Sequence, residues 1–160
     1  MSEPLEILIS SEIGALKAVA EKPHQYHVVS IRGAKTLRAP IDVIPECCLS
    51  MLVVKFEDLD DSVTAPEYIF PEKEHIKSIL DYAQGKNKIL VHCHAGISRS
   101  SAVAYVIACS RMSPEKAIEI LNPSIHMPNM RIVRLGAELL GNVSIEICAY
   151  RWYREHQNYL

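Results

Sequence analysis

The sequence predicts an α/β fold in which a central, mostly parallel sheet of four to five strands is flanked by helices. Short β-branched or apolar runs alternate along the chain with segments of helical periodicity, as they do in βαβ units. The run at residues 88–92 (KILVH) is apolar at its centre, as expected of a strand covered on both faces of a parallel sheet. The 160 residues can bury a sizeable core, and no repeat or linker interrupts them. We therefore expect one domain over residues 1–160.

The predicted strands are short apolar or β-branched runs bounded by polar or turn residues. We expect them at residues 5–9, 26–31, 48–56 and 88–92. The segment at 34–46 carries two prolines and the segment at 57–65 is acidic, so both are expected to be loops.

The predicted helices have apolar residues at helical spacing and a cap or a breaker near one end. They are expected at residues 12–20, between Pro71 and Gly85, at 99–112, from Ser113 onward, at 129–140 and in the last stretch of the chain. Ser10 or Ser11 can cap the first of them, and Gly141 can end the fifth. In the last stretch one apolar or aromatic face is formed by Ile145, Cys148, Ala149, Trp152, His156 and Tyr159. We expect that face to pack in the core or to cap the sheet, and the alternative is a surface for a dimer or another partner.

Composition and charge exclude several classes of partner. The formal net charge is -2, so no bulk attraction to nucleic acid or to an anionic membrane is expected. No apolar run approaches the roughly 20 residues that a membrane span needs. The first residues are acidic and lack the basic start of a secretory signal. We therefore expect a cytoplasmic protein with no nucleic-acid or membrane partner, and we favour a monomer.

Five cysteines are present, at positions 47, 48, 93, 109 and 148. Their number is odd and no Cys-x-x-Cys pair occurs, so reduced thiols are expected rather than a disulfide framework. A metal site is not expected, because His92, Cys93 and His94 are adjacent and cannot all converge on one ion. Cys47 and Cys48 are interpreted as buried strand residues. The alternative is that one of them forms a reversible disulfide with Cys93 that protects the thiol.

Residues 88–101 (KILVHCHAGISRSS) carry the chemistry. A buried strand delivers Cys93 to the end of the sheet, and six residues later Arg99 begins a helix. The backbone between them must curl into a cup of N–H groups, which together with the helix N-terminus favours an anion and a thiolate. Gly96 permits the sharp turn, and Arg99 can hold two phosphate oxygens in a planar fork. The Ser100 hydroxyl can stabilise the sulfur as thiolate.

This His-Cys-x5-Arg-Ser pattern resembles the signature loop of the protein tyrosine phosphatase superfamily. It is most similar to the compact dual-specificity phosphatases, of the small bacterial type, and the resemblance runs from about residue 43 to residue 141. It implies a dual-specificity-phosphatase-like fold in which Cys93 is the nucleophile and His92 orients the loop. The implied phosphate-binding residues are His94, Ala95, Gly96, Ile97, Ser98 and Arg99. No metal or organic cofactor is implied.

The resemblance also implies an Asp, on a loop 30 to 40 residues before the Cys, that protonates the leaving oxygen. Asp58 directly follows an apolar run and is our choice, with Asp61 and Asp60 as reserves. Glu57 fits less well because it continues the alternating strand pattern. Asn129 matches a family position that braces the signature loop.

The predicted function is that of a cysteine-dependent phosphate-monoester hydrolase. It would act on phosphotyrosine, and on phosphoserine or phosphothreonine if the pocket is shallow. The loop contains no Lys, which disfavours inositol phosphates. The alternatives are a phosphatase for small molecules or RNA 5′-phosphates, a rhodanese-like sulfur transferase, and a phosphate-binding module without turnover. The partner is accordingly a phosphorylated protein or a small phosphate ester.

Overall fold

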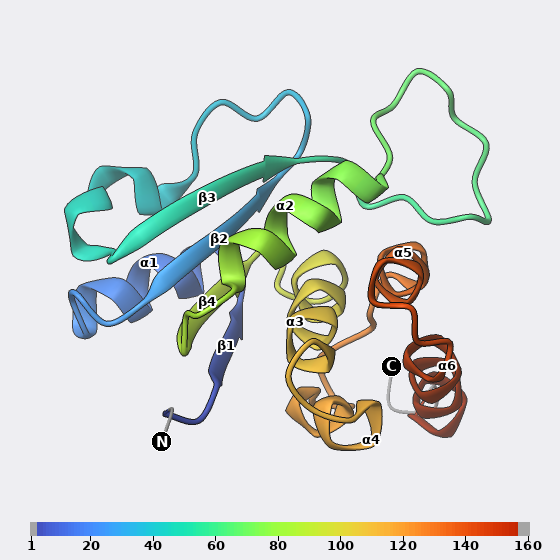
Figure 1. The fold of residues 1–160 in the computed structure, drawn as a ribbon. Helices are drawn as coiled ribbons and strands as arrows, with labels where there is room; N and C mark the ends of the chain where they lie inside the picture. Colours follow the sequence, from blue (N-terminus) through green and yellow to red (C-terminus); the bar gives the residue numbers. More distant parts are fainter. Residues whose placement is uncertain (1–2, 157–160) are drawn as a thin grey trace.

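A four-stranded parallel β-sheet lies at the centre of the computed structural model, which describes residues 3–156 (Figure 1). Its strands have the spatial order β1-β4-β2-β3. The strand bounds are β1 Glu6–Ser10, β2 His27–Arg32, β3 Ser50–Lys55 and β4 Lys88–His92. The sequence prediction of four to five mostly parallel strands, with the apolar 88–92 run inside the sheet, is therefore confirmed.

The strand register brings three chain segments to one edge of the sheet. His92 at the end of β4 is level with Ser10 of β1 on one side and with Ser30 of β2 on the other. Because all the strands are parallel, the segments that follow them leave the sheet at the same edge. This edge is where ligands bind in open α/β sheets, and it is where residue 93 lies.

Six α-helices cover the sheet within the described residues. Their bounds are α1 Glu12–Glu21, α2 Lys73–Ala83, α3 Arg99–Cys109, α4 Pro114–Ala117, α5 Met130–Leu140 and α6 Ser144–His156. Helix α1 covers one face, whereas α2 and α3 cover the other, with α5 and α6 packed outside them (Figure 1). None of the helices in residues 3–156 is long and apolar enough to cross a membrane.

Helix α3 is the centre of the larger core cluster. Every residue from 100 to 108 is buried, and the Tyr105 hydroxyl donates to the carbonyl of Ile145 at 2.7 Å. Helix α5 approaches α3 closely at Gly136, where an added Cβ would lie 2.5 Å from both methyl carbons of Val106. The helix that begins at residue 99 is thus held by neighbours along its length.

Several sequence expectations need correction. The 34–46 loop contains short 3-10 turns at Pro40–Val43 and Pro45–Cys47. Cys47 and Cys48, expected to be buried strand residues, lie in and just after the second turn and are half-buried. The helix expected at 99–112 ends at Cys109, and the one from Ser113 is a single turn that tightens into a 3-10 turn at Ile118–Ile120. Proline disfavours helical geometry in the residue before it, so Pro114 and Pro123 limit both segments. Tyr159 lies outside the described residues.

Candidate active site

The Cys93 thiol sits inside the loop that follows β4, the signature loop (residues 93–98). Its side chain is buried, with 3% of the residue exposed. The N–H of Gly96 donates to Sγ at 3.3 Å, and the Ser100 hydroxyl oxygen lies 3.2 Å from the same sulfur. Two polar hydrogens can therefore point at the sulfur, and such contacts stabilise a thiolate more than a thiol.

Gly96 lets the loop pack against the start of α1. Its φ is +74°, and an added Cβ would lie 2.5 Å from the backbone nitrogen of Ser11. One step away, the Glu12 N–H donates to the carbonyl of His94 at 3.2 Å. The turn between β1 and α1 therefore supports the loop from outside, and only glycine fits at position 96.

Arg99 is the first residue of α3 and projects beside the loop. Its Nη1 donates to the carbonyl of Phe56 at 2.9 Å, so the guanidinium is tied to the strand end that precedes Asp58. A cation at a helix N-terminus is unfavourable unless an anion accompanies it. The Arg99 guanidinium and the amides of the signature loop can together bind such an anion.

Asp58 is held over the signature loop by two side chains. Its Oδ1 accepts from the Ser98 hydroxyl at 2.8 Å and from Nδ2 of Asn129 at 2.9 Å. The same Nδ2 donates to the carbonyl of Leu59 at 3.1 Å, while the Asn129 Oδ1 caps α5 by accepting from the Ile132 N–H at 3.1 Å. Asn129 thus connects the start of α5 to the loop that carries Asp58, which we call the acid loop (residues 57–71).

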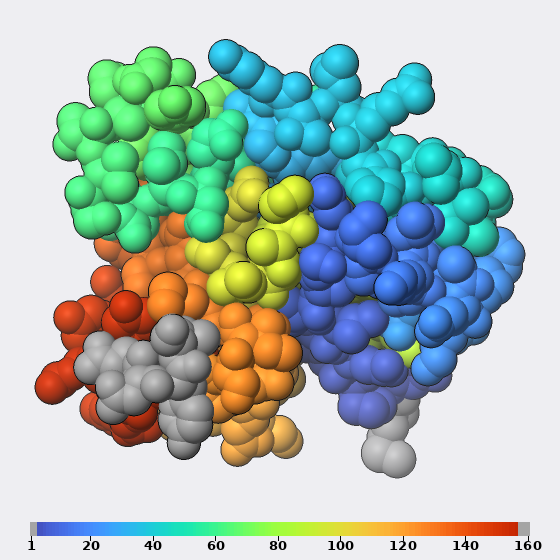
Figure 2. All heavy atoms as spheres, turned by 180° about the vertical axis from the view of Figure 1, so that it is seen from behind, coloured from blue at the N-terminus to red at the C-terminus, as the bar shows by residue number. Residues whose placement is uncertain are grey.

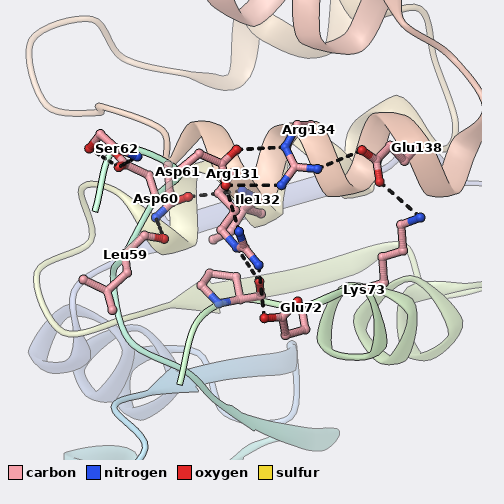
Figure 3. A network of polar contacts seen from close by, with 12 residues as sticks. Leu59, Asp60, Asp61, Ser62, Glu72, Lys73, Arg131, Ile132, Arg134 and Glu138 are labelled. Atoms are coloured by element: carbon pink, nitrogen blue, oxygen red, sulfur yellow. Dashed lines mark hydrogen bonds and ion pairs between the residues drawn. The ribbon is translucent and has the colours of Figure 1, made fainter. Parts of the chain in front are cut away.

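The two reserve carboxylates are engaged differently. Asp60 Oδ1 accepts from the N–H of Ser62 at 2.9 Å and from its hydroxyl. Asp61 binds Arg131 at 2.8 Å and Arg134 at 2.9 Å (Figure 3). The Arg134 and Arg131 guanidinium groups hold the pKa of Asp61 below its usual value. A carboxyl that stays ionised is poorly suited to donate a proton, so Asp58 and Asp60 are the better candidates.

His92 lies behind the loop rather than in front of it. Only 1% of the residue is exposed, its Nε2 is 2.7 Å from the Ser30 hydroxyl, and its Nδ1 is 3.1 Å from the carbonyl of Cys93. Burial lowers the pKa of His92, so the ring is neutral at physiological pH. This position fits the orienting role expected from the sequence.

A cleft of about 670 Å³ opens in front of the thiol. Figure 2 shows the signature loop (yellow) at the centre of one face, between the acid loop (green), the 122–130 segment (orange) and the start of α1 (blue). The lining residues are Asp58, Asp60, Cys93, His94, Ala95, Ile97, Ser98, Arg99, Met127, Pro128, Asn129, Met130, Tyr150 and Tyr153. Eight residues that the sequence singled out as first choices are thus together, while His92, Gly96 and Ser100 lie behind them.

The sequence did not identify the two tyrosines of α6 as part of this cleft. Tyr150 and Tyr153 are three residues apart on the helix, next to the face that buries Ala149 and Trp152. The face that was expected to pack in the core does not include these tyrosines, and its members Ile145, Ala149 and Trp152 are buried. The spacing of three residues indicated only that the two tyrosines share one side of a helix. The sequence did not show that this helix lies beside the signature loop, some 50 residues earlier in the chain.

The reversible disulfide considered for Cys93 does not fit the topology. Cys47 and Cys48 precede β3, whose first residue Ser50 is level with His27 and hence with Ile89. Cys93 therefore lies about six residues, or roughly 20 Å, farther along the strand direction than Cys48. Disulfides need Cα atoms within about 7 Å, so neither cysteine can reach it without rearrangement. All five cysteines are free, and residues 3–156 contain no cluster of His, Cys, Asp and Glu suited to a metal.

Comparison with known sequences gives one family and two curated relatives. The family model "Dual specificity phosphatase, catalytic domain" matches residues 22–135. Protein 123R of Invertebrate iridescent virus 6, which is named as a tyrosine phosphatase, is 36% identical over 85 residues, or 51% of this chain and 59% of that protein. MAP kinase phosphatase with leucine-rich repeats protein 3 of Dictyostelium discoideum is 33% identical over 70 residues, or 42% of this chain and 8% of that protein. The bacterial type expected from the sequence stays a prediction.

Solved structures share the fold. DUSP15 aligns with a TM-score of 0.57 at 19% identity, covering 94% of this chain and 93% of that one. Tk-PTP in its active form aligns with a TM-score of 0.58 at 19% identity, covering 88% and 93%. The matched family segment contains the signature loop, the acid loop and Asn129, but it includes neither α1 nor α6.

Proposed function

The chain belongs to the dual specificity phosphatase catalytic-domain family, and we propose that it hydrolyses phosphate monoesters through a cysteinyl-phosphate formed on Cys93. One observation carries the proposal. The Cys93 sulfur is buried at the floor of a cleft, where it accepts from the Gly96 N–H and lies 3.2 Å from the Ser100 hydroxyl, and Arg99 and Asp58 line the same cleft. A nucleophile, an oxyanion clamp and an acid are the three parts that phosphate-ester cleavage requires.

In the first step the Cys93 thiolate attacks phosphorus and the bond to the ester oxygen breaks. Asp58 in its protonated form delivers a proton to that oxygen, so the alcohol or phenol leaves neutral. The Arg99 fork and the amides of the signature loop hold the equatorial oxygens, where negative charge accumulates.

In the second step water attacks the cysteinyl-phosphate and displaces the sulfur. Asp58, now ionised, accepts the proton of the water, and inorganic phosphate is released. Ser100 can donate its hydroxyl hydrogen to the departing sulfur, from which it lies 3.2 Å away. This contact stabilises the thiolate as a leaving group and regenerates the starting enzyme.

The proposed substrates are phosphotyrosine and phosphoserine or phosphothreonine in proteins. Apolar and aromatic side chains line much of the cleft around the loop, among them Met127, Tyr150 and Tyr153, which suits an aryl or peptide substrate. No lysine occurs among the described residues that line it, so a second phosphate would find few partners there. The alternative substrates are small phosphate esters, which the same mechanism can hydrolyse.

The location, domain organisation and oligomeric state of the protein belong to the same proposal. A cytoplasmic location is supported by the need to keep the Cys93 thiol reduced. A single domain over the whole chain is supported by one sheet with apolar clusters on both of its faces. We propose a monomer, which sedimentation or light scattering can test directly.

The test is hydrolysis of p-nitrophenyl phosphate between about pH 5 and 8 in the presence of EDTA, for the wild type and for Cys93→Ser. The expected result is turnover that resists EDTA and is abolished by the substitution. A phosphopeptide that binds the wild type without being hydrolysed would indicate a binding module. Turnover that survives Cys93→Ser would refute the covalent mechanism.

A further inference from the structure

Four polar side chains form a continuous hydrogen-bonded chain behind the signature loop, on the sheet face covered by α1. Asp42 accepts from Nη1 and Nη2 of Arg32 at 2.8 and 2.6 Å. The Nε of Arg32 donates to the Ser30 hydroxyl oxygen at 2.9 Å, and that oxygen lies 2.7 Å from His92 Nε2. His92 Nδ1 ends the chain at the carbonyl of Cys93, 3.1 Å away.

The two ends of this chain fix the direction of every hydrogen bond. An arginine Nε–H can only donate, so the Ser30 oxygen accepts there and its own hydrogen is available to His92 Nε2. A carbonyl can only accept, so His92 Nδ1 must carry the hydrogen that points at Cys93. Both ends therefore require the same neutral tautomer of His92, and burial disfavours the charged ring.

Stability alone does not explain polar groups at these positions. Ser30, Arg32 and His92 are 0%, 6% and 1% exposed. They share their sheet face with Val28 and Leu90, which belong to an apolar core cluster. A buried charged pair generally stabilises a fold no better than well-packed apolar side chains would. The hydrogen-bonded series ends at the carbonyl of Cys93, which indicates a role in holding the peptide of the nucleophile.

We propose that Ser30 and Arg32 are positioning residues that act through His92 to hold the peptide following Cys93. The inference rests on the proposed function, because it takes Cys93 as the nucleophile. In a trans peptide the carbonyl and the next N–H point in opposite directions, and no cis peptide occurs in the described chain. With the Cys93 carbonyl bound to His92, its negative end is kept away from the sulfur. The arrangement favours the thiolate.

The variants can be chosen so that they leave unchanged the charges around the four hydrogen-bonded side chains. Glu12, Arg32 and Asp42 act electrostatically on His92. Asp58, Asp60, His94 and Arg99 line the cleft together with Cys93. Ser30→Ala removes only a hydroxyl. Arg32→Lys keeps the charge but loses the planar fork that reaches Ser30 and Asp42 together.

The experiment is alkylation of Cys93 by iodoacetamide as a function of pH, quantified by mass spectrometry of the Cys93 peptide. Only the thiolate reacts, so the profile reports the fraction of thiolate without requiring turnover. We expect Ser30→Ala and Arg32→Lys to move the midpoint toward higher pH. A shift of about one pH unit would make alkylation about tenfold slower below the midpoint.

The matched control is Ser50→Ala. Ser50 makes the same 2.7 Å contact with a histidine, His27, between neighbouring strands at the opposite end of the sheet. It is expected to change stability without moving the alkylation profile. Circular dichroism of each variant verifies the fold, and Arg32→Lys serves where Ser30→Ala does not fold.

Two results would overturn the inference. One is an alkylation profile of Ser30→Ala and Arg32→Lys that coincides with the wild type, and the other is an equal shift in Ser50→Ala. The proposed function has its own readout in phosphate release. A wild-type chain without turnover whose variants still shift the profile would reject the phosphatase and keep the positioning role.

Discussion

The two halves of the cleft are built in different ways. The half that carries Cys93 is buried, and its polar contacts to the sulfur come from Gly96 and Ser100, within seven residues along the chain. The half that carries Asp58 is a loop near the surface. Its side-chain contacts come from Ser98, 40 positions away on the signature loop, and from the start of α5 and its N-cap Asn129, about 70 positions away. The first half is fixed by a strand, a turn and a core helix. The second depends on side-chain pairs that water and salt can reach.

This difference suggests a division of labour. A thiolate and an oxyanion clamp need a fixed geometry from the start, which a buried frame provides. A proton donor must approach the leaving group only once the substrate is bound, and a loop held by surface ion pairs can adjust at little cost. Substitutions in the two halves should therefore have different signatures.

The largest effect is expected from Asp58→Asn, in the acid half. Loss of the proton donor should lower kcat by about 100- to 10,000-fold for phenyl phosphate, whose leaving group needs the proton. The loss should be much smaller for p-nitrophenyl phosphate, and the basic limb of the pH profile should disappear. The control is Asp60→Asn, which changes the neighbouring carboxylate of the same cleft. If Asp60→Asn alone produced this pattern, the assignment of the acid would move to Asp60.

Gly96→Ala should have the next largest effect, in the nucleophile half. The new Cβ would meet the backbone of Ser10 and Ser11, and the φ of +74° is strained for alanine. We expect kcat/KM to fall by about 100-fold for good and poor leaving groups alike. The control is Gly85→Ala, which has a φ of +78° but nothing within 4 Å of the added carbon. That control should lose about 1 kcal/mol of stability and no activity. Wild-type turnover in Gly96→Ala would contradict the close packing of the loop.

A smaller effect is expected from Asp61→Asn, which loosens the acid loop. Arg131 binds Asp61 near the start of this loop (Figure 3). It also donates to the Pro71 carbonyl at the end of the loop, at 2.7 Å. We expect a loss of about tenfold in kcat for phenyl phosphate and less for p-nitrophenyl phosphate. High salt should reproduce part of this loss in the wild type. Asp81→Asn, which breaks the exposed pair with Lys77 on α2, should leave turnover unchanged.

The same substitution has a signature in stability against pH. The two arginines hold the pKa of Asp61 below its usual value, so the folded state binds that proton less readily than the unfolded chain does. The ion pair therefore contributes stability above the unfolded pKa near 4, and this contribution is lost as pH falls through the lower folded value. Urea unfolding of wild type and Asp61→Asn should differ at pH 7 and converge in acid. A constant difference would exclude this ion pair as the cause.

The smallest effect is expected from Tyr150→Ala, at the outer rim of the cleft. The residue is 58% exposed, so loss of its ring should raise KM for aryl phosphates by about two- to threefold and leave kcat unchanged. The control is Tyr68→Ala, which is similarly exposed at 54% but does not line the cleft. Equal changes in both variants would argue against a substrate contact on α6.

The nucleophile half could be predicted from the sequence because its information is local. Residues 88–101 contain the strand, the turn glycine and the helix start, each recognisable from neighbouring residue types. The choice of Asp58 depended on the family resemblance, which implies an acid on the loop after this strand, and on its place just beyond the apolar run that contains β3. The sequence could not separate Asp61 from its neighbours, since the arginines that hold it ionised lie on α5.

The support behind the loop was missed for a different reason. Ser30 lies in the 26–31 run that was predicted to be a buried strand, and Arg32 is one residue beyond it. The strand extends to Arg32, and alternation places both side chains on one face. Two polar residues on the same buried face were a signal, but their partner Asp42 stands in a segment expected to be featureless loop. The Cys47 and Cys48 hypothesis failed because it depended on which end of the sheet each cysteine occupies. The number of residues between two cysteines does not show at which end of the sheet each one lies.

The pairing of β1 with β4 has a consequence for fragments of this protein. The family match begins at residue 22, whereas β1 pairs with β4 along its whole length and α1 supports the signature loop. A fragment cut at that boundary would turn β4 into an edge strand, with a row of unpaired N–H and carbonyl groups beside the nucleophile. Such edges recruit strands from other chains. β1 is itself an edge strand, so the cut replaces a half-buried edge by the buried, apolar strand β4, and we expect the fragment to associate more readily than the intact chain.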